Sequence, residues 1–404
     1  MVSKTRILVL ATTFPRWRND TEPAFVYELS TRLAKKYDIS VLAPHHNRAK
    51  TFEKFDGLTV YRFPYFYPFS LQKLCYEGGI FQNLKSRFAV RLLIPFFILS
   101  EVFSTFALVG RNKFNLLHAH WVIPQGFIAA LIKKIYGVPY IVTAHAGDVF
   151  PVKSRFLRVF ARFALRNADY CTVNSDYTKN SVTKILPLKN IKIIPMGVDV
   201  GVFNKSGKSK AVRKKLSISG KFILSVGRLA EKKGVIYLIM AMPAVLKQYP
   251  DAKLVIVGEG SEKDALKKKV LELNIKKSVI FAGNVKNNKL PDYYKSADVF
   301  VGPSIITKSG DTEGLGIVFL EALSAGTPAI GSNIGGIPDI IKDKKTGLLV
   351  EQKSPVKIAD AIIEVLSNKG LAETLAKNGK AHVIKNYSWD NVAKKFSELI
   401  ESWI

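Results

Sequence analysis

Cysteine and acidic residues are both scarce in this sequence of 404 residues. The only two cysteines, Cys75 and Cys171, lie far apart and lack metal-ligand spacing. They argue against a disulfide scaffold and for a reducing compartment. Aspartate and glutamate number 32, against 61 lysines and arginines, so the formal net charge is +29. No nucleic-acid recognition motif accompanies this charge, and we therefore expect no nucleic acid as a partner.

The excess of basic residues has two interpretations, and the sequence leaves both open. A membrane carrying anionic lipid would attract such a surface, which would place the protein peripherally at the inner face of the cell membrane. Alternatively, the lysines are only solvated, as in the run Lys267–Lys269 on a polar helix face. In either case we expect a cytoplasmic protein.

The sequence also lacks an unbroken apolar run of the roughly 20 residues that span a membrane. The apolar run near the N-terminus is brief and is expected to be a strand, not a signal peptide. The most apolar segment, Phe88–Val109, is interrupted by Arg91, Pro95 and Glu101. We expect a buried helix or helix pair there; a helix in the membrane interface, or one lining a cleft for a lipid tail, are the alternatives. The nearby aromatic run Tyr61–Phe69 could join such a surface.

Short apolar runs alternate with helical patterns along the chain, which is typical of α/β domains with parallel sheets. A lysine- and serine-rich segment after Asn204 breaks the alternation, which restarts at Phe222. The length suits two domains. Strands are predicted at Arg6–Thr12, Ile39–Ala43, Leu58–Phe63, Leu116–His118, Tyr140–Ala144, Tyr170–Asn174, Ile191–Ile194, Phe222–Val226, Lys253–Gly258, Val279–Ala282 and Val299–Pro303.

The stretch Asp311–Ser332 is predicted to be a polar loop, a helix that starts at Ile317 and stops at Gly326, and a short strand, Pro328–Gly331. Glu313 precedes the helix, and Glu321 is expected about two turns into it, roughly 9 Å further along. Glycines at the helix start leave backbone N–H groups available, which suits a phosphate. Glu313 would repel a phosphate and should face a neutral, hydroxyl-rich group. Either glutamate alone would be read as solvated, but the combination fits a nucleotide sugar, with its hexose, diphosphate and ribose.

A basic turn, GRLAEKKG, follows the predicted strand Phe222–Val226. Ligands of such sheets bind at the carboxyl ends of the strands, where Arg228 and Lys233 would lie. One guanidinium and one ammonium would neutralise a diphosphate and later stabilise it as a leaving group. Lys232 is expected to be a solvated side chain.

These motifs resemble the donor site of the retaining nucleotide-sugar glycosyltransferases with the GT-B fold, in their family four (group 1). The resemblance implies two doubly wound Rossmann-like domains that face each other across a cleft. It places the acceptor-side domain at 1–203, the donor domain at 204–385, and a closing helix at 386–404 that crosses back to the first domain.

The resemblance also implies roles for single residues. Glu313 would contact the sugar hydroxyls, Glu321 the ribose hydroxyls, and Arg228 and Lys233 the diphosphate. The other implied donor contacts are Gly314, Leu315, Gly316 and Ile317 at the helix start, and Gly258, Asn284 and Val285 beside the nucleobase.

In the first domain, His145 resembles the family's histidine that faces the sugar, and Asp148 is a further candidate for the acceptor side. His118 and His120, two apart on a strand, are expected to face opposite sides and to be structural. We therefore expect no metal site.

One loop departs from the family pattern. The family has paired glycines after its first strand, whereas this chain has no glycine between Thr12 and Phe25. We assign no donor contact to that loop. Arg16, Trp17 and Arg18 are instead hypothesised to meet the acceptor.

The sequence thus predicts a retaining hexosyltransferase that moves a sugar from a nucleoside diphosphate to an acceptor hydroxyl, in polysaccharide or glycolipid synthesis. The acceptor would be a sugar or a lipid-linked sugar. No cofactor is expected, because the protein supplies the positive charge at the diphosphate. The alternatives are a nucleotide-sugar epimerase or hydrolase on the same fold, and a non-catalytic membrane-associated binding protein.

Overall fold

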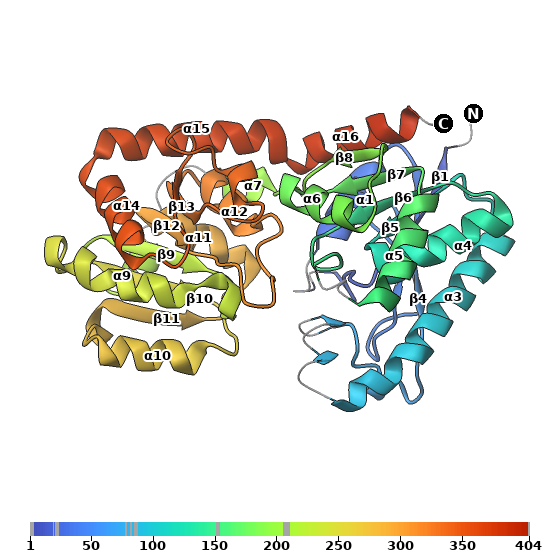
Figure 1. Ribbon diagram of the computed structural model, residues 1–404, viewed down its shortest axis with the longest axis horizontal. Helices are drawn as coiled ribbons and strands as arrows, with labels where there is room; N and C mark the ends of the chain where they lie inside the picture. Colours follow the sequence, from blue (N-terminus) through green and yellow to red (C-terminus); the bar gives the residue numbers. More distant parts are fainter. Residues whose placement is uncertain are drawn as a thin grey trace. The chain divides into compact units, whose positions relative to one another are not determined.

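The computed structural model describes residues 4–18, 20, 24–76, 79–80, 83–84, 88–150, 154–204 and 211–402. Part of the glycine-free loop and the first part of the lysine- and serine-rich segment, residues 205–210, lie outside these residues. The chain forms two compact units, shown in Figure 1. The first comprises residues 1–174, 178–194 and 393–404, and the second comprises residues 175–177 and 195–392. The predicted boundary at 203/204 stays a prediction.

The first unit holds an eight-stranded sheet in the order β3-β4-β2-β1-β5-β6-β7-β8, in which β3 alone is antiparallel to its neighbour. β1, β5 and β6 are buried along almost their whole length, which explains their continuous apolar sequences. The strands are β1 (Arg6–Leu10), β2 (Asp38–Pro44), β3 (Phe52–Phe55), β4 (Leu58–Phe63), β5 (Leu116–His120), β6 (Tyr140–Ala144), β7 (Tyr170–Val173) and β8 (Ile191–Ile193), and the main helices are α1 (Phe25–Leu33), α3 (Ile94–Arg111), α4 (Phe127–Tyr136), α5 (Arg155–Asn167) and α6 (Asp176–Ile185).

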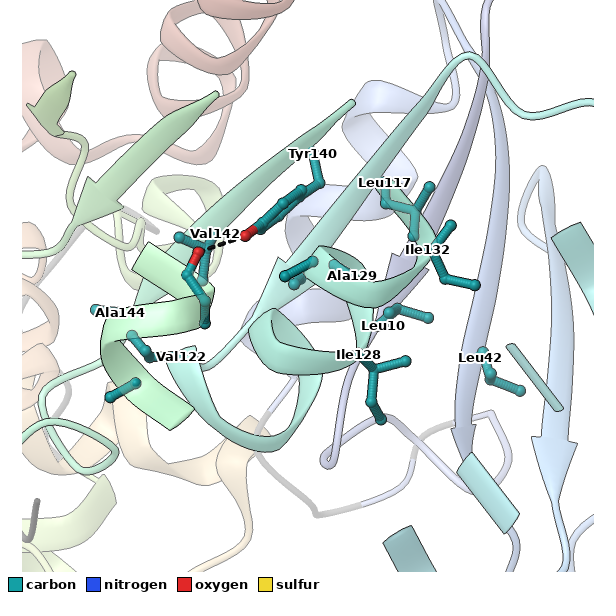
Figure 2. Close-up of a cluster of buried hydrophobic side chains, with 14 of the residues drawn as sticks. Leu10, Leu42, Leu117, Val122, Ile128, Ala129, Ile132, Tyr140, Val142 and Ala144 are labelled. Carbon is teal, nitrogen blue, oxygen red and sulfur yellow. Dashed lines mark hydrogen bonds between the residues drawn. The ribbon is translucent and has the colours of Figure 1, made fainter. Parts of the chain in front are cut away.

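The core of the first unit lies between this sheet and α4. Leu10, Leu117 and Val142 from three strands face Ile128 and its neighbours on α4 (Figure 2). Apolar side chains recur on one face of α4 at helical spacing, so their burial fixes the helix on the sheet. The Tyr140 hydroxyl, which is also buried in this core, donates a hydrogen bond to the backbone carbonyl of Ala164 on α5 (Figure 2).

The second unit holds a six-stranded parallel sheet in the order β11-β10-β9-β12-β13-β14. A core of aliphatic side chains joins one face of the sheet to α9, α10 and α14. On the other face, Phe300 of β12 packs edge-on against Phe319 of α12, with ring centroids 5.3 Å apart. The strands are β9 (Phe222–Val226), β10 (Lys253–Val257), β11 (Val279–Gly283), β12 (Val299–Gly302), β13 (Ala329–Ser332) and β14 (Leu348–Val350). The helices are α7 (Val200–Phe203), α8 (Ala211–Lys215), α9 (Val235–Gln248), α10 (Lys263–Glu272), α11 (Leu290–Ser296), α12 (Ile317–Ser324), α13 (Ile337–Ile340), α14 (Pro355–Ser367) and α15 (Lys369–Tyr387).

The last helix, α16 (Trp389–Glu401), starts in the second unit, and its residues from Ala393 onward belong to the first. There, Phe396 packs against the ring of His118 with centroids 5.2 Å apart, and Glu401 accepts a hydrogen bond from the Tyr37 hydroxyl at 3.2 Å.

The apolar segment forms one continuous stretch of helix, not a pair. The 3-10 turn η2 (Phe88–Leu93) runs directly into α3. Pro95 does not interrupt α3, because it lies in the first turn, where a helix needs no N–H from that residue. By length and composition alone this stretch is apolar enough to cross a membrane, and only 28% of its most apolar window is buried. The expectation of a buried helix therefore holds for one of its faces only.

Candidate active site

The strand order of the second sheet marks where a ligand can bind. Chain connections leave β9 toward β10 on one side and reach β12 on the other, so the order reverses between β9 and β12. Ligands of open parallel sheets bind at the carboxyl ends of the strands at such a switch point. The loop after β9 carries Arg228 and Lys233, and the loop after β12 leads to Glu313 and α12.

Lys233 and Glu313 meet at this point. The Lys233 ammonium donates to the Glu313 carboxylate, and the two side chains are 19% and 14% exposed. Lys232 makes a parallel contact, with Nζ 3.1 Å from Asp311 Oδ1 and 3.3 Å from the Thr312 carbonyl oxygen. The expectation that Lys232 is solvated is therefore wrong: it ties the β9 loop to the β12 loop.

Positive charge dominates around Glu313. Burial alone would raise the pKa of its carboxyl, but the charges of Lys233, Lys232 and Arg228 outweigh burial and lower the pKa below its ordinary value. Glu313 is thus ionised at neutral pH. The Arg228 side chain is exposed, which leaves it accessible to a ligand.

Helix α12 begins where the sequence predicts, but Glu321 lies less far along it than expected. Its first residue is Ile317, directly after Gly316, so Glu321 lies little more than one turn into the helix and not two. Gly314 and Leu315 complete the loop that leads to the helix N-terminus, where the first backbone N–H groups have no partner within the helix. This end of α12 carries the partial positive charge that favours an anion.

Glu321 is held by a residue that sequence reasoning missed. The Tyr294 hydroxyl on α11 donates a hydrogen bond to Glu321 Oε2 at 2.7 Å. Burial raises the pKa of the Glu321 carboxyl to about 7, against the lowering effects of the Tyr294 hydrogen bond and the Lys233 charge. Tyr294 itself is fully buried, so the hydrogen bond fixes both side chains.

The loops after β9, β10 and β11 crowd together beside this site. Gly258 has a φ of +130°, and a Cβ there would lie 2.0 Å from the carbonyl oxygen of Gly227. Only glycine allows this approach. Asn284 is exposed and Val285 is half-buried in the loop after β11.

A second glycine loop, also missed, supports the start of α12. A Cβ on Gly336 would lie 2.2 Å from the carbonyl oxygen of Gly314, and the Gly336 N–H donates to the Glu313 carbonyl at 3.0 Å. The run Gly335–Gly336 in the sequence is the signal that could have revealed this contact.

In the first unit, three histidines form a row. The rings of His118 and His120 have centroids 4.2 Å apart, and His120 Nδ1 lies 2.9 Å from His145 Nε2. The expectation that His118 and His120 face opposite sides is wrong, because residues two apart on a strand point to the same face. Burial lowers the pKa of His118 and of His145 to about 3, and that of His120 well below its ordinary value, so all three are neutral at physiological pH.

Asp148 joins the loops that carry these histidines. Its Oδ2 accepts from the Val122 N–H at 2.7 Å, and its Oδ1 accepts from the His145 N–H at 2.9 Å. Trp121 and Ala146, which directly follow His120 and His145, adopt positive φ angles of 81° and 73°. Such strained backbone clusters at functional sites. The structure thus gives Asp148 a structural task, and its predicted acceptor contact stays a prediction.

The loop after β1 places Arg16 and Trp17 differently from each other. Arg16 is buried and makes two hydrogen bonds of 2.8 Å to the Asp20 carboxylate, so its guanidinium is engaged within the protein. The Trp17 ring is exposed and lies beside that guanidinium: the ring centroid is 4.5 Å from Arg16 Cζ.

Metal-ligating side chains do not converge in the part of the chain that the structure describes: no group of three or more His, Cys, Asp or Glu there could hold an ion. The three histidines stack side by side instead of pointing at one centre.

Comparison with known proteins identifies the family. The profile described as Glycosyl transferases group 1 matches residues 208–382, and that of Glycosyltransferase Family 4 matches residues 24–202. An uncharacterized glycosyltransferase of Methanocaldococcus jannaschii is 34% identical over 313 residues, which cover 74% of this chain and 78% of the relative. The chain belongs to the group 1 glycosyltransferases. This confirms the resemblance that the donor-site motifs indicated.

A second relative of this glycosyltransferase has a stated substrate. The GDP-mannose-dependent alpha-(1-6)-phosphatidylinositol monomannoside mannosyltransferase of Mycolicibacterium smegmatis is 30% identical, over 72% of this chain and 78% of the relative. Among solved structures, sucrose-phosphate synthase of Thermosynechococcus elongatus superposes with a TM-score of 0.80 and 22% identity, covering 99% of each chain. That likeness confirms the predicted α/β fold of the glycosyltransferase.

Proposed function

We propose that this glycosyltransferase moves a hexosyl group from a nucleoside diphosphate sugar to an acceptor hydroxyl, with retention of the anomeric configuration. The observation that carries the proposal is the Lys233–Glu313 ion pair at the switch point of the second sheet. The pair places a cation that can bind phosphate directly beside a carboxylate that can bind hydroxyl groups. In a nucleotide sugar, the diphosphate and the sugar hydroxyls are likewise next to each other.

The donor would lie across the ends of β9 and β12. Its diphosphate would contact Arg228, Lys233 and the first backbone N–H groups of α12 near Gly316. Its sugar hydroxyls would donate to Glu313, and its ribose hydroxyls to Glu321, which Tyr294 holds in place. The base would border Gly258, Asn284 and Val285. The contact of His145 with the sugar stays a prediction from the family resemblance.

For the chemical step we propose that the acceptor hydroxyl attacks the anomeric carbon on the same face of the sugar from which the diphosphate leaves. The bond from the acceptor oxygen to the anomeric carbon forms as the bond from that carbon to the phosphate oxygen breaks. The acceptor proton passes to the departing phosphate. Same-face attack needs no nucleophile from the protein, so we assign Glu313 no covalent bond to the sugar.

The cations of the protein would stabilise the leaving diphosphate in place of a divalent metal. Arg228 and Lys233 together carry two positive charges at the position that a metal would otherwise neutralise. We therefore propose that transfer continues at an undiminished rate in excess EDTA, and a metal-dependent rate would contradict this part of the proposal.

Experiments can identify which nucleotide sugar is the donor and which kind of molecule is the acceptor. The M. smegmatis relative is named for GDP-mannose and a phosphatidylinositol mannoside, which supports a role in glycolipid or polysaccharide synthesis. GDP-mannose should therefore be the first of a panel of nucleotide sugars screened by thermal shift, with UDP-glucose and UDP-N-acetylglucosamine as alternatives.

A product assay with the selected donor separates the competing activities. Transfer gives a new glycoside, whose anomeric proton coupling in an NMR spectrum reports retention or inversion. An epimerase would give only a second nucleotide sugar, a hydrolase only free sugar, and a non-catalytic binding protein no product. An inverted glycoside would contradict retention and leave the transferase assignment intact.

A further inference from the structure

Helix α3 and the turn η2 before it carry large apolar side chains on their solvent side. These side chains follow one another at intervals of three or four residues, so they form a single stripe of about 20 Å along one face. This outer stripe consists of Phe88, Leu92, Phe96, Leu99 and Phe103, which are 76%, 69%, 51%, 53% and 70% exposed.

Two polar side chains in the middle of the same helix, Glu101 and Thr105, point inward. Glu101 is fully buried, and its two carboxylate oxygens accept from Gln125 Nε2 at 2.9 and 3.2 Å. Thr105 is also fully buried and donates to the Glu101 carbonyl at 2.7 Å. A helix that faces water shows the opposite arrangement, with its apolar side chains inside. The polarity of α3 therefore suits an apolar environment on its outer side.

A neighbouring segment extends the stripe. Phe66, from the aromatic run after β4, packs edge-on against Phe96 with ring centroids 5.3 Å apart. The adjacent Tyr67 is one of the most exposed large side chains of the described residues. Tyrosine at the edge of an apolar surface is typical of contact with a lipid–water interface.

The charges around the stripe have one sign. α4 contacts both α3 and α5, so the three helices form one side of the first unit. Along α3, α4 and α5 the only acidic residue is the buried Glu101. The exposed charged side chains on η2 and these helices are Arg91, Arg111, Lys134, Arg155, Arg162 and Arg166.

We propose that this side of the first unit docks on an anionic lipid bilayer, with α3 lying in the interface and the outer stripe among the acyl chains. The basic side chains would meet the lipid headgroups. A second copy of the chain fits less well, because pairing the same surfaces would bring like charges together. The proposal does not rest on the proposed activity.

The helix lies flat on the surface in this arrangement and does not cross the bilayer. Its inner face is packed into the unit: Phe97 is buried against Phe63 of β4, with ring centroids 5.2 Å apart. If α3 crossed the bilayer, Phe97 would leave the core and the hydrogen bonds between Glu101 and Gln125 would be lost.

Sedimentation of the full chain with vesicles tests the docking proposal. The wild type should sediment with phosphatidylcholine vesicles that contain phosphatidylglycerol, should bind pure phosphatidylcholine weakly, and should lose part of its binding in high salt. The triple variant Leu92→Ser, Phe96→Ser and Phe103→Ser should partition about a hundredfold more weakly and should lose the salt-resistant part. Arg155→Gln with Arg166→Gln should weaken only the salt-sensitive part.

Matched controls come from the second unit. Leu271→Ser with Val356→Ser removes exposed apolar side chains from α10 and α14, and Lys267→Gln with Lys268→Gln removes two exposed charges from α10. Both control variants should bind vesicles like the wild type. Equal melting temperatures of all variants would show that they fold.

Three results would overturn the proposal: no sedimentation of the wild type at low salt, equal binding by the triple variant, or a wild-type dimer that the triple variant dissociates. The last result would assign the stripe to a second copy. None of these measurements uses the transfer reaction, so they are independent of the outcome of the donor assays.

Discussion

Lys233 and Glu313 form an ion pair between the loops that follow β9 and β12, two neighbouring strands of the second unit's sheet. The pair arises because the loop after β9 is basic and the loop after β12 is acidic, and the parallel sheet brings these two ends together. A donor diphosphate would draw Lys233 toward itself and leave Glu313 oxygens for the sugar. In the proposed function, the pair would hold the phosphate-binding and the sugar-binding group next to each other before the donor binds.

The two glutamates should respond differently to loss of charge. Glu321→Gln should weaken affinity for the free nucleoside diphosphate about tenfold, because a neutral amide accepts less strongly from ribose hydroxyls. Glu313→Gln should leave that affinity unchanged or slightly tighter, since Lys233 loses its competitor, while turnover of the intact donor falls. Isothermal titration calorimetry measures the affinity for the diphosphate, and steady-state kinetics measures the turnover of the donor. Equal weakening of diphosphate binding in the two variants would remove the sugar-end role of Glu313.

The ionised carboxylate of Glu321 should lower the free energy of unfolding at neutral pH. Its pKa is about 7 in the folded protein and near the ordinary 4.5 when unfolded, so the folded state holds the proton more tightly. The free energy of unfolding therefore falls as pH rises from about 4.5 to about 7, by about 3 kcal/mol. Glu321→Gln should melt several degrees above the wild type at about pH 8 and like the wild type at about pH 4.5. A melting difference that does not change with pH would contradict this account.

Tyr294→Phe should act through Glu321. The Tyr294 hydrogen bond lowers the pKa of the Glu321 carboxyl, so its loss should raise that pKa and leave the group largely protonated at neutral pH. Nucleoside diphosphate affinity should fall at about pH 7 and recover at about pH 9, where Glu321 is ionised again. A purely structural role for Tyr294 predicts an equal loss at both pH values. The double variant with Glu321→Gln should lack the recovery.

The fold was largely predictable because its buried parallel strands are apolar runs that stand out from their surroundings. Leu58–Phe63, Tyr140–Ala144 and Phe222–Val226 were predicted with the bounds of β4, β6 and β9. β3 was missed, since its sequence FEKF alternates exposed and half-buried positions on an edge and lacks an apolar run. The start of α12 at Ile317 was predicted, but Glu321 was placed about two turns into the helix, whereas it is only the fifth helical residue.

The candidate site was predictable in its residues but not in their contacts. Arg228, Lys233, Glu313 and Glu321 were selected from local motifs, yet nothing local shows that Lys233 meets a residue 80 positions away. Tyr294 lies in an unremarkable helix beside another tyrosine, so only the fold reveals its bond to Glu321. The orientation of the histidines was predicted wrongly because strand geometry was misapplied: residues two apart on a strand, such as His118 and His120, lie on the same face.

The central claim is that Arg228 and Lys233 bind the donor diphosphate, and Arg228→Ala tests it most directly. Arg228 is exposed and makes the smallest of the three cationic contributions at Glu313, so its loss should lower the melting temperature only slightly, whereas Lys233→Ala would remove the ion-pair partner of Glu313. Arg228→Ala should weaken nucleoside diphosphate binding by about 2 kcal/mol, roughly thirtyfold, and lower turnover as well, while the matched variant Lys267→Ala on α10 should change neither. Titration calorimetry that gives Arg228→Ala the wild-type affinity for UDP, GDP and ADP would contradict the account.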